Sequence, residues 1–188
     1  MHFINPNRLL ILATFLLLPY LSNGQISNEN GINEVNGFKS LKLGMSMYDI
    51  MDFGTLELNE GLYRTPSIER AEYFKFTPAN IDLTYVFDKK ITWIGLKFKD
   101  ERIVDISIVV SLTNGDINQL LLDKESLLWK IARSFQEAVG NPKKITLNTV
   151  EWQGKSTVIK ISGFYFPNDN FAGTEIRFIS STTPNRGF

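Results

Sequence analysis

Strict alternation of apolar and polar side chains is the feature that most constrains how this chain can fold. A period of two places successive side chains on opposite faces of a strand. Three such runs lie in residues 72–111, separated by short polar segments at 88–90 and 100–102. They predict an antiparallel meander of three strands joined by tight turns. The alternating apolar positions are Ile81, Leu83, Tyr85 and Phe87, then Ile94, Leu96 and Phe98, then Val104, Ile106, Ile108 and Val110.

Three further strands are predicted near the end of the chain, at 149–153, 157–161 and 175–179. Residues 72–76 are a candidate for an additional edge strand, which Pro78 would end because proline cannot donate to a sheet ladder. Together these segments predict six or seven strands in two meanders.

Two helices are predicted from capping residues and helical periodicity. Ser46 and Asp49 resemble a capping box, which favours a short helix over 46–53 with Gly54 as a left-handed C-cap. A longer helix is predicted over 118–139, with the clearest helical spacing in 124–139, and Gly140-Asn141-Pro142 ends it. We therefore expect an α+β fold in which the helices cover one sheet face. The order of helix and meander, twice over, also indicates a weak two-fold repeat.

The first 24 residues are predicted to be a cleavable signal peptide. Arg8 precedes a ten-residue apolar run, and Ser22-Asn23-Gly24 places small residues at the expected cleavage site. A membrane anchor is the alternative, but a spanning helix needs about 20 apolar residues. We expect the product to be exported to the periplasm or the cell exterior. The remaining chain is divided into a flexible leader at 25–37, a single α+β domain at 38–182 and a flexible tail at 183–188.

The chain contains no cysteine, and its only histidine is His2, inside the predicted signal. Ser-His-Asp and Cys-His catalysis, zinc sites built on His or Cys, and disulfides are therefore excluded from the mature product. No cysteine is available for a lipid anchor, and we expect neither a metal nor another cofactor. The 20 basic and 20 acidic side chains balance, which argues against nucleic acid as the main partner.

Two short stretches resemble known families. Residues 38–46, ending in Leu43-Gly44-Met45-Ser46, are similar to the opening of small exported bacterial domains. These include the β-lactamase-inhibitor-protein-like fold and the small lipoprotein of the outer-membrane barrel assembly machine. The helix end at Val139-Gly140-Asn141-Pro142, followed by Glu151-Trp152, resembles the layout of other exported proteins. The resemblance implies a non-enzymatic domain whose sheet or loops hold another macromolecule.

The candidate binding residues are aromatic or basic side chains that alternation places away from the helix-covered core. Trp93 and Lys97 share the strand face opposite Ile94, and three consecutive aromatics cannot all point into one layer. Most aromatics of this chain are expected to be core residues. The candidates are Trp93, Lys97, Phe164, Tyr165 and Phe166.

Four strand carboxylates support an alternative function. If two of Asp82, Asp105, Glu151 and Glu175 faced each other, they could act as an acid/base pair in glycan hydrolysis. More often, such residues form the solvated face of a half-exposed sheet, and this is the favoured interpretation. Asn168-Asp169-Asn170 could offer oxygen ligands to calcium, although a plain turn is the simpler interpretation. The leading hypothesis is an exported, non-catalytic binding or envelope-associated domain whose partner is a protein or a cell-envelope component.

Overall fold

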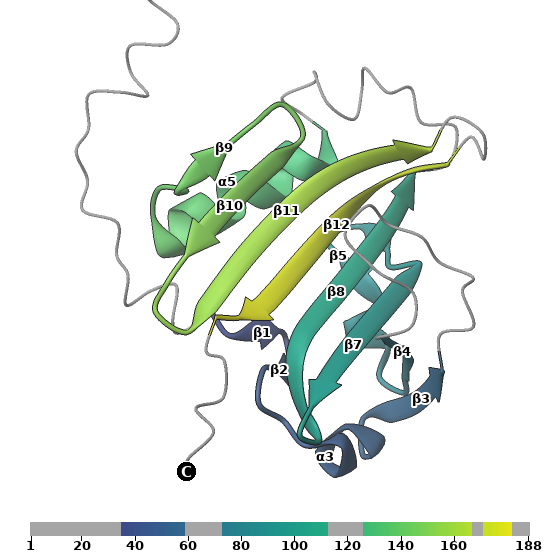
Figure 1. Ribbon diagram of the computed structural model, residues 1–188. Helices are drawn as coiled ribbons and strands as arrows, with labels where there is room; N and C mark the ends of the chain where they lie inside the picture. The colour runs from purple at the N-terminus through teal and green to yellow at the C-terminus, as the bar shows by residue number, and fades with distance from the viewer. Residues whose placement is uncertain (1–34, 59–72, 113–125, 167–170, 182–188) are drawn as a thin grey trace, which may run out of the picture.

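The computed structural model describes residues 35–58, 73–112, 126–166 and 171–181, and its main element is an eight-stranded antiparallel sheet (Figure 1). The strand order across the sheet is β3-β4-β7-β8-β12-β11-β10-β9. The α+β prediction with an antiparallel sheet is confirmed, with more strands than expected. The sheet consists of β3 (Gly54–Leu58), β4 (Phe74–Pro78), β7 (Trp93–Lys99), β8 (Arg102–Leu112), β9 (Lys144–Ile145), β10 (Thr149–Gln153), β11 (Thr157–Phe166) and β12 (Phe171–Ser180). The remaining elements are β1 (Gly37–Phe38), β2 (Leu41–Lys42), α3 (Met47–Met51), the 3-10 helix η3 (Ile81–Thr84), β5 (Tyr85–Val86), β6 (Lys89–Lys90) and α5 (Leu127–Val139).

The sheet is built from two halves with mirrored strand order. In each half a helix precedes four strands of the sheet: α3 precedes β3, β4, β7 and β8, and α5 precedes β9, β10, β11 and β12. The last strands of the two halves, β8 and β12, pair with each other at the centre. The repeat predicted from the sequence is therefore present in the topology. An approximate two-fold axis passes through the β8–β12 pair.

Helix α5 lies behind the sheet in the view of Figure 1 and covers its core face. Leu128, Ile131 and Ala132 recur at helical spacing and are buried against the strands. Gly140 ends the helix with a positive φ of 90°, which glycine adopts without a steric penalty. The carbonyl of Gly140 accepts a hydrogen bond of 2.8 Å from the indole Nε1 of Trp152, which ties the helix end to β10.

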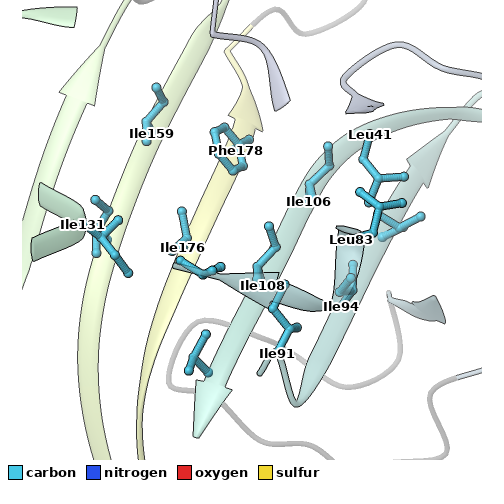
Figure 2. Close-up of a cluster of buried hydrophobic side chains, with 14 of the residues drawn as sticks. Leu41, Leu83, Ile91, Ile94, Ile106, Ile108, Ile131, Ile159, Ile176 and Phe178 are labelled. Carbon is cyan, nitrogen blue, oxygen red and sulfur yellow. The ribbon is translucent and has the colours of Figure 1, made fainter. Parts of the chain in front are cut away.

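The main core lies between this face and the elements that cover it. Figure 2 shows side chains from β7, β8, β11 and β12 directed to the same side as Ile131 of α5. Leu41 from β2 and Leu83 from η3 enter the same cluster. Because the chain has no disulfide, this burial is the main stabilising term.

The segment 81–88 differs from the predicted strand. Residues 81–84 form η3, and the following hairpin β5–β6 pairs only within itself. The side chain of Asn80 accepts from the backbone N–H of Asp82, and this cap starts a helical turn instead of a strand. Together, η3 and the β5–β6 hairpin form an insert between β4 and β7 that packs against the core face. Leu83 and Val86 of this insert are part of the core.

Other boundaries also differ from the predictions. Residues 74–78 form an inner strand, because β3, which was not predicted, pairs on its outer side. The capping box of Ser46 and Asp49 is confirmed, but Gly54 begins β3 and the helix cap is Asp52. Residues 38–43 were expected to form one short extended segment and instead form the hairpin of β1 and β2. Strand β9 was not predicted, and β11 and β12 are longer than expected. The predicted start of the long helix, the signal, most of the leader and the tail lie outside the described residues.

Replacing Ile108 by alanine tests how much the core face of the central pair contributes. Ile108 is fully buried on β8 and pairs with Ile176 of β12. We expect the Ile108→Ala variant to lose about 3 kcal/mol of unfolding free energy in chemical denaturation, from lost burial and a residual cavity. Ile145→Ala, at an exposed site on β9, should change it by less than about 0.5 kcal/mol. Equal effects of the two substitutions would contradict this assignment of the core.

Candidate functional site

The face of the sheet opposite α5 carries a second, smaller cluster of buried side chains. Tyr73, Trp93, Val109 and Phe164 form it, and Phe166 and Phe171 pack against it. The rings of Phe166 and Phe171 are stacked at 6.4 Å between centroids. We call this cluster the aromatic layer, and polar side chains of β8 and β12 lie beside it on the same face.

Two glycines make room for the largest rings of this layer. A Cβ atom on Gly95 would lie 2.0 Å from the indole of Trp93, which therefore rests flat over the β7 backbone. A Cβ on Gly173 would lie 2.6 Å from the ring of Phe164, its cross-strand neighbour. Each glycine pairs with an aromatic residue that covers exposed backbone, as in aromatic rescue of sheet glycines.

An ion pair lies beside the aromatic layer on the same face of the sheet. The guanidinium of Arg177 on β12 binds the carboxylate of Asp105 on β8, and its Nη2 also donates to the hydroxyl of Tyr73 at 2.8 Å. The Tyr73 hydroxyl in turn donates to Oδ2 of Asp105 at 2.7 Å. The residue directly opposite Asp105 is Ile179, so Arg177, two residues away on β12, contacts Asp105 as a diagonal cross-strand pair.

A second polar contact repeats this arrangement across the approximate two-fold axis. Ser107 of β8 donates to Oε1 of Glu175 on β12 at 2.7 Å. Ser107 and Arg177 are directly opposite each other, and each contacts the acid located two residues along the other strand. Asp105 and Glu175 therefore occupy equivalent positions in the two halves of the sheet.

The network holds its groups in fixed protonation states. Burial, followed by the nearby charge of Asp105, raises the pKa of Tyr73, so its hydroxyl stays protonated and donates. Burial alone would lower the pKa of Arg177, but its hydrogen bond and charge interaction with Asp105 outweigh this, and its pKa is raised. The arginine is therefore a permanent cation that is bound to Asp105.

The four strand carboxylates do not converge on one cleft. Asp105 and Glu175 lie on the same face, where both are buried and hydrogen-bonded. Asp82 is exposed on η3, and Glu151 is half-buried on β10 opposite Lys160. The arrangement fits a structural ion network better than an acid/base pair. Residues 168–170, considered for calcium, lie outside the described residues.

The predicted binding residues are divided between the two sheet faces. Trp93, Phe164 and Phe166 meet in the aromatic layer, but Trp93 and Phe164 are only 2% and 4% exposed. Lys97 is half-buried on the same face, opposite Asp105. Tyr165 is half-buried and points to the other face, because it alternates with Phe164 and Phe166. Trp93 also lines a hollow of about 280 Å³ between β4 and β7, strands that pair only at Phe74 and Lys75.

A groove of about 310 Å³ on the core face of the molecule was not predicted from the sequence. Its walls come from four parts of the chain: the β1–β2 turn, the β5–β6 hairpin, α5 and β12. Most of the surface is apolar. It is lined by Gly37, Phe38, Lys39, Tyr85, Val86, Phe87, Ile131, Ser134, Phe135, Ile176 and Phe178.

No group of three or more metal-binding side chains occurs among the described residues. Within the same residues, no helix has both the length and the apolar character to cross a membrane. Comparison of the chain with protein-family models, with curated proteins and with solved structures found no match.

Replacing Gly95 by alanine tests the packing of the aromatic layer. Gly→Ala within a strand is ordinarily favourable, but here the new methyl group would displace the indole of Trp93. We expect Gly95→Ala to destabilise the protein by about 1–3 kcal/mol in urea denaturation. In a Trp93→Leu background the same substitution should be close to neutral. Equal effects in both backgrounds would show that the ring does not occupy this space.

Because of Tyr73, the unfolding free energy of the protein should fall at alkaline pH. Because its folded-state pKa is raised, its contribution is fully present below the unfolded-state value near 10.0 and is lost as pH rises above it. We expect the unfolding free energy to fall above pH 10 with a slope of up to about 1.4 kcal/mol per pH unit from this residue. The Tyr73→Phe variant should be less stable at pH 8 but should lack this part of the slope. An unchanged slope would contradict the buried, protonated role.

Proposed function

We propose that this protein is an exported, non-catalytic binding domain. The groove between α5 and the β5–β6 hairpin is its binding site. The occupant is an apolar segment of another protein or of a cell-envelope component. A concave, mostly apolar hollow with few polar groups is the usual form of a binding site.

The groove is held open by contacts between segments far apart in the sequence. The ammonium of Lys39, at the β1–β2 turn, donates to the backbone carbonyl of Tyr85 at 2.9 Å and also to that of Asp82. It lies 5.1 Å from the centroid of the Phe38 ring. These contacts hold the β1–β2 turn and the β5–β6 hairpin in place relative to each other. The conformational entropy lost when a partner binds is therefore small.

Phe87 is the observation that carries the proposal. It is 60% exposed at the tip of the β5–β6 hairpin and has a φ of 52°. Positive φ is usual in a two-residue hairpin turn, where Asn, Asp and Gly are the preferred residues, so an exposed aromatic side chain is uncommon at this position. Lys39, the other wall of the groove, also has a φ of 52°. The two remaining non-glycine residues with positive φ in the described chain, Asp100 and Glu101, form the two-residue turn between β7 and β8. Phe87 differs from them in placing a large apolar side chain at such a turn.

The alternative of a carboxylate-dependent hydrolase acting on glycans has less support. It needs one carboxyl group that can be protonated and a second that is accessible to a sugar or water. Asp105 is bound by Arg177 and Tyr73, and Glu175 is buried and accepts from Ser107. These contacts stabilise the sheet and leave the binding domain as the better-supported function.

The Phe87→Gly variant separates binding from folding. Glycine accepts the left-handed backbone, and the Phe87 ring is largely exposed, so we expect unchanged or slightly higher stability. Peptides selected from a random library on the wild-type protein should bind this variant at least about tenfold more weakly, because an exposed aromatic anchor is lost. Titration calorimetry gives the affinity, and NMR shifts should map the selected peptides to Ile131, Ser134 and Phe135.

Leu147→Gly is the matched control, since Leu147 is an exposed apolar side chain near β9 that does not line the groove. It should leave peptide affinity unchanged. The proposal fails if the library yields no binders. It fails equally if the selected peptides bind both variants as tightly as the wild type.

A further inference from the structure

The two edges of the sheet differ in how well they are protected. Edge strand β9 has two residues, one of them Lys144, and it follows Pro142 closely. Short length, lysine and proline are common devices that prevent edge-to-edge pairing. At the other end, β3 has five residues and a single charge, Glu57. Among the described residues β3 pairs only with β4, so its outer edge presents backbone donors and acceptors.

The segment that contains this edge also carries the largest exposed apolar side chains of its end of the sheet. Tyr48 and Met51 of α3 are 71% and 58% exposed, and Leu58 at the end of β3 is 72% exposed. Phe53, between them, is partly exposed. An exposed apolar edge strand is an association site rather than an ordinary surface.

We propose that β3 pairs with β3 of a second copy of this chain, in antiparallel orientation across a two-fold axis. Centred on Leu56, the pairing places Thr55 opposite Glu57 of the second copy. The single negative charge of the strand therefore faces a hydroxyl group and not its own equivalent, which would repel it. The two eight-stranded sheets become one continuous sheet.

The antiparallel orientation also brings the apolar side chains together. Helix α3 precedes β3, so the α3 of one copy lies beside the Leu58 end of the other strand. The exposed parts of the four apolar side chains offer roughly 400 Å² per copy, since a large side chain presents about 150–250 Å². Two copies and the paired backbone edges reach the approximately 1,000 Å² that a specific interface needs. A second copy satisfies the hydrogen bonds and buries the apolar groups with one symmetric contact.

Sedimentation of the purified protein tests the dimer. We expect a concentration-dependent species of roughly twice the monomer mass at micromolar protein. Tyr48→Lys combined with Leu58→Lys should raise the dimer dissociation constant at least about tenfold without lowering stability, because both side chains are exposed. The matched control, Ile145→Lys combined with Leu147→Lys, makes the same change at the β9 end and should leave the dimer intact.

The lack of native cysteine allows the register to be measured directly. Directly opposite residues have Cα atoms about 4.5–5.5 Å apart, which suits a disulfide. A mixture of Thr55→Cys and Glu57→Cys proteins should therefore form a crosslinked heterodimer faster than either variant alone. The proposal is overturned if the wild type stays monomeric at hundreds of micromolar, or if only the β9 variant dissociates. It is also overturned if the two single variants crosslink as fast as the mixture, or if β3 pairs with a different protein.

Discussion

The pairing of β8 with β12 is the contact on which the rest of the structure depends. It joins the two halves of the sheet, and both faces of the molecule use it. On one face Ile108 and Ile176 fill the core beneath α5. On the other, Asp105 of β8 binds Arg177 of β12. Separation of these strands would expose the apolar core and leave buried charges without their partners, which is strongly unfavourable. The β8–β12 pairing therefore favours cooperative unfolding of the whole sheet over independent unfolding of its two halves.

Much of the fold could be predicted from the alternation of side chains, because a half-buried strand repeats every two residues. Alternation predicted the strands in 93–112 and strands β10, β11 and β12. It failed at 81–88, where the same period occurs in a capped helical turn and a small hairpin that send Leu83 and Val86 into the core. Strands β1, β2 and β9 have two residues each, too few for any period to be visible.

The functional sites were harder to predict, because they depend on which strands become neighbours. Alternation placed Trp93 on the face opposite Ile94, but it did not indicate that Phe164 and Phe166 would join it there. Their burial depends on Gly95 and Gly173, whose role is visible only once the rings are placed. The ion pair joins residues 72 positions apart in the sequence. The groove draws on four segments of the chain, none of which has a distinctive motif.

The mirrored order of the sheet is broken at one place. Between β4 and β7 the chain inserts η3 and the β5–β6 hairpin, whereas β10 and β11 are joined by a tight turn at Gly154. The insert belongs to one half alone and forms one wall of the groove, while α5 and β12 of the other half form the opposite wall. The insert takes no part in the β8–β12 pairing. Evolution could exchange or resize residues 79–92 to alter ligand preference while the scaffold stays unchanged.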